Sequence, residues 1–198
     1  LLRRITLTVS FTMSTVFFPM AEWRVTRWMQ PIFQLFFDEK TQKDCSVSEL
    51  QEGLLRISII DEIRRSLMRY DDAPARLEEY FAYIDEAYGD MLTIKAAGYL
   101  YLKDVLTEKE LRAIVLAEIC QALYSVASLG KRKPLEPLLY GYAAFLDSLW
   151  EGGALEKTEQ RLSLNLQKAL LCTEQLLRSL EYYVALGTRE ETKEFFDR

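Results

Sequence analysis

Residues 107–130 read TEKELRAIVLAEICQALYSVASLG, and this stretch decides the fold class. It opens on a capping box, in which the Thr107 hydroxyl can accept a hydrogen bond from the Glu110 N–H while the Glu110 carboxylate reaches back to the Thr107 N–H. Apolar side chains then recur every three or four residues, at Leu111, Ile114, Val115, Ile119, Leu123 and Val126. Gly130 supplies a left-handed stop. The stretch therefore predicts one long amphipathic helix.

Two more capping boxes start helices in the same way, Ser46 with Glu49 and Thr188 with Glu191. Apolar residues recur at helical spacing in the segments that follow. Only eight glycines and five prolines occur in 198 residues, whereas a fold of many short strands needs such residues in its tight turns. We therefore predict an all-α fold, a single-domain bundle of six or seven helices.

The longest helix is expected near the C-terminus. Gly152–Gly153 and Gly187 bracket residues 154–186, and neither proline nor glycine interrupts that interval. Leucines such as Leu171 and Leu177 widen its apolar stripe, and a wide stripe suggests burial on two sides. We predict one continuous helix over 154–186 and expect it to be the main element for association.

Residues 1–21 allow three interpretations. The first is a secretory signal peptide. Such a peptide has a basic start, here Arg3–Arg4, followed by an apolar run and a small residue before the cleavage site, here Ala21. An initiator methionine is absent, which favours a non-native leader as the second interpretation. Residues 5–13 alternate apolar and hydroxyl side chains, which indicates a short strand as the third. We prefer the signal peptide, which indicates an exported or periplasmic protein; a cytoplasmic protein is the alternative. Residues 22–198 then form the helical domain.

Residues 22–37 combine tryptophan, phenylalanine and arginine in one predicted helix. We favour a helix of the core that Pro31 bends or interrupts, because proline lacks an N–H and clashes with the preceding turn. The alternative is a helix that lies in a membrane interface through Trp23–Phe37, since aromatic and basic side chains together suit that position.

The sequence contains no histidine. Histidine is the usual proton shuttle near neutral pH and the commonest nitrogen ligand of zinc, copper and iron. Its absence excludes Ser-His-Asp and Cys-His catalysis and every metal site that needs an imidazole. The glycines also form no phosphate-binding loop. We therefore assign no catalytic residue, no metal ligand and no cofactor.

The three cysteines are Cys45, Cys120 and Cys172, and no pair of them has C-x-x-C spacing. Cys120 and Cys172 fall inside apolar helical segments, where a free cysteine usually serves as a small buried hydrophobe. We expect both thiols to be buried and unpaired.

The candidate binding residues are tyrosines and arginines. Tyrosine combines an apolar ring with a polar tip, which suits clefts and interfaces, and an arginine cluster can take an anion or an acidic partner. The candidates are Tyr80, Tyr83, Tyr88, Tyr99, Tyr140, Arg64, Arg65 and Arg69. Ordinary positions at the edge of a helical core explain the same tyrosine spacing, and a solvated helix face explains the arginines.

Composition and motifs together favour binding over chemistry. The formal net charge of −5 lacks the broad excess of lysine and arginine that phosphate neutralisation requires, so we expect no nucleic-acid partner. The leading hypothesis is a non-catalytic helical protein that binds a protein partner or self-associates as a homo-oligomer. The first alternative is a membrane-peripheral or envelope protein that uses the helix at 22–37. The second is a histidine-free small-ligand binder or enzyme with a tyrosine and carboxylate cleft.

Overall fold

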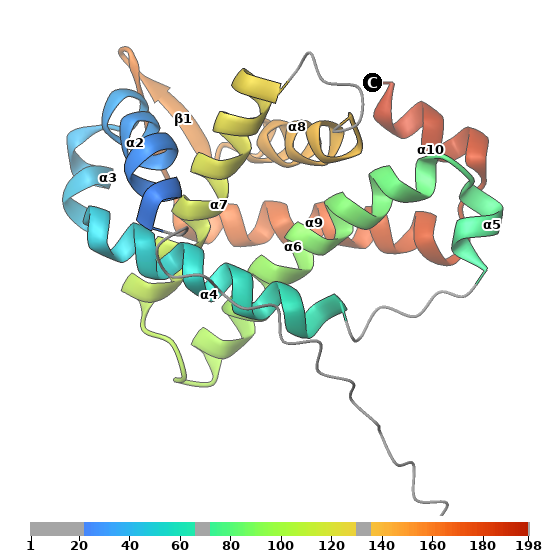
Figure 1. Ribbon diagram of the computed structural model, residues 1–198, viewed down its shortest axis with the longest axis horizontal. Coiled ribbons are helices and arrows are strands. Elements are labelled where there is room, and N and C mark those ends of the chain that lie inside the picture. The colour runs from blue at the N-terminus through green and yellow to red at the C-terminus, as the bar shows by residue number, and fades with distance from the viewer. Residues whose placement is uncertain (1–21, 66–71, 130–135, 198) are drawn as a thin grey trace, which may run out of the picture.

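The computed structural model describes residues 22–65, 72–129 and 136–197, and this part of the chain is 81% helical. Five long helices form its body (Figure 1): α4 (Val47–Arg65), α6 (Tyr80–Leu102), α7 (Glu108–Leu129), α8 (Glu136–Glu151) and α9 (Leu166–Ala185). The shorter elements are the π-helical turn η1 (Val25–Met29), α2 (Gln30–Phe36), α3 (Glu39–Asp44), α5 (Ala73–Leu77) and α10 (Arg189–Phe196). The predicted all-α fold is confirmed. The helices α3 and α5, of six and five residues, come in addition to those that the sequence indicates, because they are too brief to give a periodic signal.

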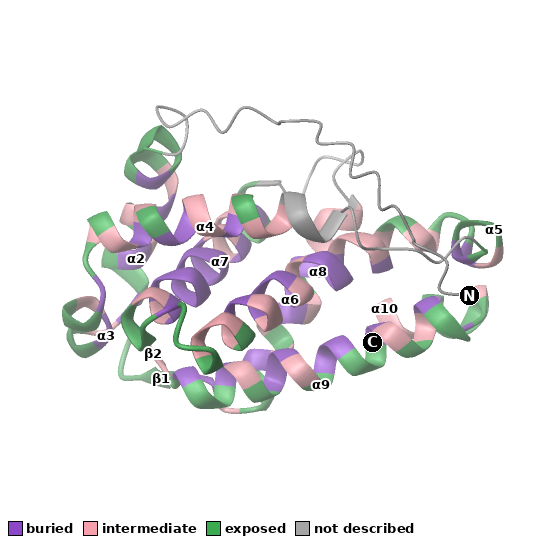
Figure 2. Ribbon diagram, turned by 90° about the horizontal axis from the view of Figure 1, so that it is seen from below, coloured by how far each residue is buried: buried purple, intermediate pink, exposed green. Residues whose placement is uncertain are grey.

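α7 is the central helix. Its residues Ala113–Cys120 are all buried, so neighbours cover it on every side rather than along one stripe. α4 packs along α7, α8 packs on both α6 and α7, and α9 packs on α6. Figure 2 shows the buried residues gathered on the inner faces of α6, α7 and α8. Of the described helices, α7 is also long and apolar enough to cross a membrane, but most of that stretch is buried inside the molecule.

Two facing capping boxes fasten the start of α7 to α4. Both form as predicted, because the N–H groups of Ser46 and Thr107 each donate to a carboxylate three residues ahead over 2.7 Å. Each of these carboxylates also pairs with the other helix: Lys109 Nζ lies 2.5 Å from Glu49, and Arg56 Nη2 lies 2.6 Å from Glu110. We call this group the α4–α7 clamp, and its members are Ser46, Glu49, Arg56, Thr107, Lys109 and Glu110.

Glycine lets the long helices touch backbone to backbone. A Cβ at Gly53 of α4 would overlap the carbonyl of Ala113 in α7. At the crossing of α8 and α6, a Cβ at Gly141 would lie 3.2 Å from the Ala87 backbone. The helices therefore approach one another more closely than larger residues would allow.

The continuous helix predicted over 154–186 is wrong. α8 ends in a Schellman-type turn, with Gly153 in the left-handed region at φ 63°. The N–H of Ala154 donates to the carbonyl of Leu149 over 2.8 Å, which closes that turn. The chain then leaves the helical conformation altogether.

A β-hairpin occupies the first part of that interval. β1 (Leu155–Thr158) pairs antiparallel with β2 (Arg161–Leu164), and Glu159 in the turn has φ 58°. Asn165 then caps α9, because its side chain accepts a hydrogen bond from the Lys168 N–H. The leucines of the hairpin lie at spacings that a helix shares, so periodicity could not separate the two structures.

Residues 22–37 form the core segment that the favoured interpretation predicts. The buried side chains recur every four residues, at Val25, Met29, Phe33 and Phe37. Pro31 sits in the first turn of α2, directly after the π-helical turn η1, and the backbone stays helical from one into the other, so the segment is locally widened before Pro31 and not interrupted. The outer side exposes Trp23, Leu35 and Phe36. The interpretations of residues 1–21 fall outside the described residues.

All three cysteines are buried and unpaired, which confirms the prediction for Cys120 and Cys172. Burial raises the pKa of the Cys45 thiol to about 12, and it also raises the pKa of the Cys120 and Cys172 thiols. These thiols are therefore neutral near pH 7 and poor nucleophiles.

Candidate binding sites

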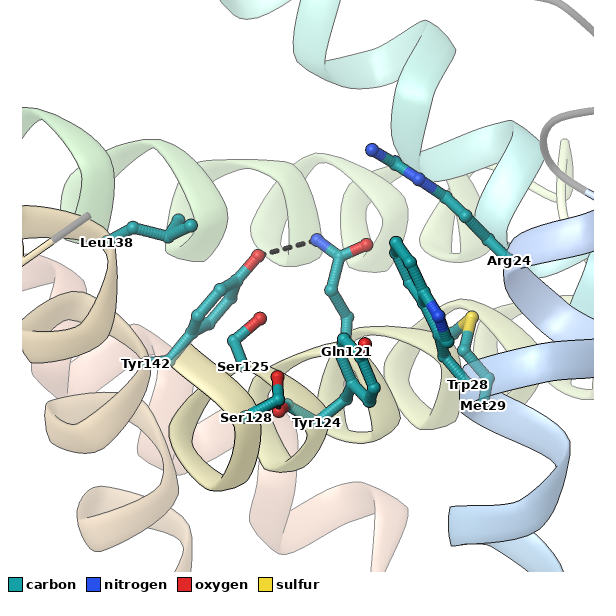
Figure 3. Close-up of a pocket in the computed structure, with 9 residues that line it drawn as sticks. All are labelled: Arg24, Trp28, Met29, Gln121, Tyr124, Ser125, Ser128, Leu138 and Tyr142. Carbon is teal, nitrogen blue, oxygen red and sulfur yellow. Dashed lines mark hydrogen bonds between the residues drawn. The ribbon is translucent and has the colours of Figure 1, made fainter. Parts of the chain in front are cut away.

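A cavity of about 440 Å³ lies where three segments meet: the N-terminal turn η1, the second half of α7 and the start of α8 (Figure 3). Its lining residues are Arg24, Trp28, Met29, Gln121, Tyr124, Ser125, Ser128, Leu138 and Tyr142. Both this volume and this mixture of apolar side chains with a few convergent polar groups are typical of small-molecule sites. We call it the α7 cavity.

One wall of the α7 cavity is aromatic. The rings of Trp28 and Tyr124 stack with centroids 4.6 Å apart and planes only 9° from parallel. The Arg24 guanidinium lies 5.9 Å from the centre of the Trp28 ring, within the range of a cation–π contact. Figure 3 places Arg24 beyond Trp28, away from Tyr142. The positive charge of Arg24 therefore belongs to one rim of the cavity.

The opposite, inner end holds a buried tyrosine. Tyr142 is 2% exposed, and its hydroxyl accepts a hydrogen bond from Gln121 Nε2 over 2.5 Å. Burial raises the pKa of Tyr142 well above its ordinary value, and the nearby carboxylates of Glu118, Asp90 and Glu86 raise it further against the effect of the Gln121 hydrogen bond. The phenol therefore stays neutral and serves as a hydrogen-bonding group.

Ser125 differs from other hydroxyl residues on the helices. Ser128 and Thr173 donate back to carbonyls four residues earlier, over 2.6 and 2.8 Å. Ser125 is only 5% exposed, yet within the described part of the chain its hydroxyl forms no hydrogen bond. Figure 3 shows this hydroxyl directed into the space between Tyr142 and Gln121. The inner end of the cavity thus presents a buried hydroxyl that is available to a ligand.

A larger and more open groove of about 740 Å³ runs along α8, α9 and α10. Its lining residues are Tyr140, Ala143, Ala144, Asp147, Ser148, Glu151, Gly152, Gln175, Leu176, Ser179, Phe195 and Phe196. Aromatic rings form the end beside α10, two carboxylates mark the other end, and short side chains lie between them. None of the described residues that line it is basic. We call it the α8–α10 groove.

Three of the five predicted tyrosines come together beside this groove. The Tyr83 ring lies 5.5 Å from Tyr80 and 5.2 Å from Tyr140, measured between centroids. Phe196 of α10 joins them at 5.6 Å from Tyr83. Tyr140 lines the groove, whereas Tyr80 and Tyr83 are not among its lining residues.

The other predicted residues lie elsewhere. Tyr88 is 6% exposed and belongs to the core, whereas Tyr99 is 59% exposed near the end of α6. Arg64 and Arg65 are the last two residues of α4, and their side chains are outside the described part of the chain. Arg69 lies outside the described residues altogether. Across those residues, no group of three or more acidic or cysteine side chains is arranged to hold a metal ion.

The sequence analysis missed the α7 cavity, whose tyrosines are Tyr124 and Tyr142. One signal was available, because positions 121, 124, 125 and 128 place polar side chains on one face of an otherwise apolar helix. The contact between Tyr124 and Trp28 joins residues far apart in the chain and cannot be derived from spacing.

No protein-family model matches the chain, and no curated protein matches it either. Its fold is similar to part of dipeptidyl-peptidase III. The structure of that protein from Corallococcus sp. strain EGB matches with a TM-score of 0.72 and 18% identity, over 91% of this chain and 34% of that one. The DPP III structure from Caldithrix abyssi matches with a TM-score of 0.75 and 15% identity, over 91% of this chain and 35% of that one. The chain spans about a third of the length of these proteins, and the likeness concerns the helical fold.

Proposed function

We propose that this protein binds a protein partner and that the α8–α10 groove holds a basic amphipathic helix of that partner. The observation that carries the proposal is the distribution of side chains along the groove. Tyr140 and Phe196 form an aromatic end, and Asp147 and Glu151 form an acidic end. A helix with apolar residues on one face and lysine or arginine on its flank complements both ends.

The floor of the groove suits a helix in shape. Ala143, Ala144 and Ser148 have short side chains, so the backbone of a partner helix can approach α8 closely. From Tyr140 to Gly152 the groove extends about 18 Å, at 1.5 Å per helical residue. Roughly three turns of a partner helix cover the same length.

The charge of the groove selects a basic partner. Asp147 and Glu151 are both exposed and lie one helical turn apart on α8. Because none of the described lining residues is basic, these carboxylates attract lysine and arginine side chains from outside. The net charge of −5 acts in the same direction during the approach of a partner.

The likeness to dipeptidyl-peptidase III supports this proposal in one respect. In those proteins a similar helical fold makes up about a third of a longer chain. A helical body of this kind thus occurs as one part of a larger molecule, where further polypeptide accompanies it. A binding role for this chain needs no peptidase chemistry, and the sequence contains no histidine to supply it in the usual way.

A designed peptide tests the groove directly. The probe is a fluorescein-labelled 14-residue helix with leucine on one face and lysine on the other, titrated with the protein in about 0.15 M salt and followed by anisotropy. The matched peptide replaces every lysine by glutamate. We expect the lysine peptide to bind and the glutamate peptide to bind at least tenfold more weakly.

Charge reversal then locates the binding. The double variant Asp147→Lys/Glu151→Lys should weaken binding of the lysine peptide about tenfold or more. The control variant Glu39→Lys/Glu159→Lys changes the net charge by the same amount at exposed positions away from the groove, and should have an effect of at most about twofold. Equal losses in both variants would reject the groove as the binding surface. A stable dimer by sedimentation that the peptide leaves intact would place self-association on another face.

A further inference from the structure

We propose that the α7 cavity binds a small primary amine, in its ammonium form, that carries an aromatic or alkyl tail. The ammonium lies at the inner end of the cavity against Ser125 and Gln121. The tail lies between Tyr124 and Leu138. The cavity shares no lining residue with the α8–α10 groove, so this site is independent of the proposed protein partner.

Two side-chain oxygens of α7 face the cavity, that of Ser125 at the inner end and that of Gln121 on the Trp28 side. Ser125 is 5% exposed, and its hydroxyl forms no hydrogen bond within the described residues and points into the cavity. Gln121 gives an N–H to Tyr142, which leaves its carbonyl oxygen as an acceptor, and Figure 3 shows that oxygen on the side facing Trp28. An ammonium group has three N–H donors and no acceptor, so it can donate to a hydroxyl or amide oxygen that has no other donor.

Apolar side chains make up much of the cavity lining. They include Tyr124, Tyr142, Leu138 and Met29, the last of which is 2% exposed. The tyrosine rings attract a cation through their faces and also cover an apolar tail. Arg24 lies beyond Trp28, so it repels a positive head from that rim and favours the inner end.

Carboxylates behind the inner end favour a positive charge there. Glu118 on α7 is 1% exposed, and Asp90 and Glu86 lie on the neighbouring helix α6. All three act electrostatically on Tyr142, whose ring forms the inner wall of the cavity. The same negative field stabilises an ammonium bound beside that ring, whereas it disfavours a carboxylate ligand.

Three probes that share a 2-phenylethyl group and differ in charge test the charge assignment. Isothermal titration calorimetry compares 2-phenylethylammonium with neutral 2-phenylethanol and anionic 3-phenylpropionate at pH 7. We expect the amine to bind with a Kd of about 10⁻⁴ M, and the alcohol and the acid to bind at least tenfold more weakly. Equal or tighter binding of the acid, lost in Arg24→Gln, would overturn the proposal in favour of an anion site. Absence of amine binding up to about 10 mM would also overturn it.

A pair of serine variants tests the position of the ligand's ammonium group. Ser125→Ala should weaken amine binding about tenfold, because it removes one acceptor of a charge-assisted hydrogen bond. Ser58→Ala is the matched control, since its hydroxyl on α4 is likewise engaged with a carbonyl four residues earlier, that of Leu54, and does not line the cavity; it should stay within about twofold. Gln121→Leu, which removes a second acceptor, provides an independent readout, and circular dichroism of each variant confirms folding. Unchanged affinity in both Ser125→Ala and Gln121→Leu would place the amine elsewhere.

The source of the amine is resolved by a second titration. Nα-acetyl-lysine amide carries the same ammonium on a peptide-like body, whereas 2-phenylethylammonium is a free small molecule. Tighter binding of the free arylalkyl amine, sensitive to Ser125→Ala, supports a metabolite-sized ligand as proposed. Tighter binding of the lysine derivative, with the same sensitivity, would overturn the free ligand in favour of a lysine side chain.

Discussion

The two ends of α7 differ in how their polar side chains are bonded. At its first turn, the hydroxyl and carboxylate groups of the α4–α7 clamp are bonded both along their own helix and across to the neighbouring one. At its other end Ser125 is buried without a hydrogen bond among the described residues, and a cavity of about 440 Å³ lies beside it. One end contributes to stability, and the other keeps polar groups available for a ligand.

This difference predicts which substitutions should lower the stability of the protein and which should lower its affinity for a ligand. A polar group that already has partners loses them on substitution, so the protein loses stability. A polar group that faces a cavity and has no protein partner loses no bond on substitution, so the substitution should affect ligand binding instead of stability. The two ends of one helix can therefore be separated by measuring stability and affinity side by side.

The largest effect is expected where α4 and α7 touch. Gly53→Ala places a methyl group on the Ala113 carbonyl, so the helices must move apart, and the free energy of unfolding should fall by about 2 kcal/mol. Gly98→Ala is the matched control, because its added methyl would lie 3.6 Å from Leu170. It should be neutral or gain up to about 1 kcal/mol. Urea unfolding followed by circular dichroism measures both, and equal midpoints would contradict tight contact at Gly53.

The next effect comes from the capping box. Thr107→Ala removes the hydroxyl that caps the Glu110 N–H, and should lower the free energy of unfolding by about 1 kcal/mol. Ser128→Ala removes an exposed hydroxyl near the other end of α7, and should change it by less than about 0.5 kcal/mol. Thermal melts of the two variants provide the comparison. If Thr107→Ala has the same melting temperature as the wild type, the Thr107–Glu110 capping box does not stabilise the protein.

Acid should weaken the α4–α7 clamp. The Lys109 side chain lowers the pKa of Glu49 by hydrogen bonding, and the Thr107 N–H does the same for Glu110, so both pKa values fall below the ordinary value of 4.5. Because these pKa values are lower in the folded than in the unfolded chain, the stabilisation is complete above about pH 4.5 and is lost as the pH falls through the folded values.

The matching variant is Glu49→Gln/Glu110→Gln. It should be less stable than the wild type at pH 7, and the difference should shrink towards pH 3 because the wild-type carboxyls become protonated too. Urea midpoints from pH 7 down to pH 3 measure this convergence. Parallel curves for the two proteins would show that these carboxylates contribute nothing specific to their ionised form.

The smallest effect on stability is expected at Ser125. Ser125→Ala removes a hydroxyl with no hydrogen bond in the described part of the chain, so the free energy of unfolding should stay within about 0.5 kcal/mol of the wild type. Chemical unfolding under the conditions used for Gly53→Ala gives the value. A loss of 1 kcal/mol or more would show that the protein itself uses this hydroxyl, and would remove support for the amine site.

Local signals in the sequence predicted the framework of the fold. The three capping boxes involve residues only three apart, and all three form as the sequence indicates. The hairpin at β1 and β2 was missed because its leucines fit a helical spacing, and because the non-glycine residue Glu159 takes a left-handed conformation in its turn. The α7 cavity was missed because Trp28 and Tyr124 meet only through tertiary packing. Of the tyrosines chosen by spacing, Tyr140 lines the α8–α10 groove, and a binding role for them stays a prediction.

The β1–β2 hairpin, which replaces the first part of the helix predicted over 154–186, also offers a site for attaching a label. Its turn, with Glu159 and Gln160, is exposed, and Figure 1 places the hairpin at the opposite end of the molecule from α10. Neither residue lines the α7 cavity or the α8–α10 groove. A dye or affinity tag inserted between them would replace one tight connection by a longer one, which surface loops tolerate at little cost. The protein could then be immobilised or tracked with both of its proposed binding surfaces uncovered.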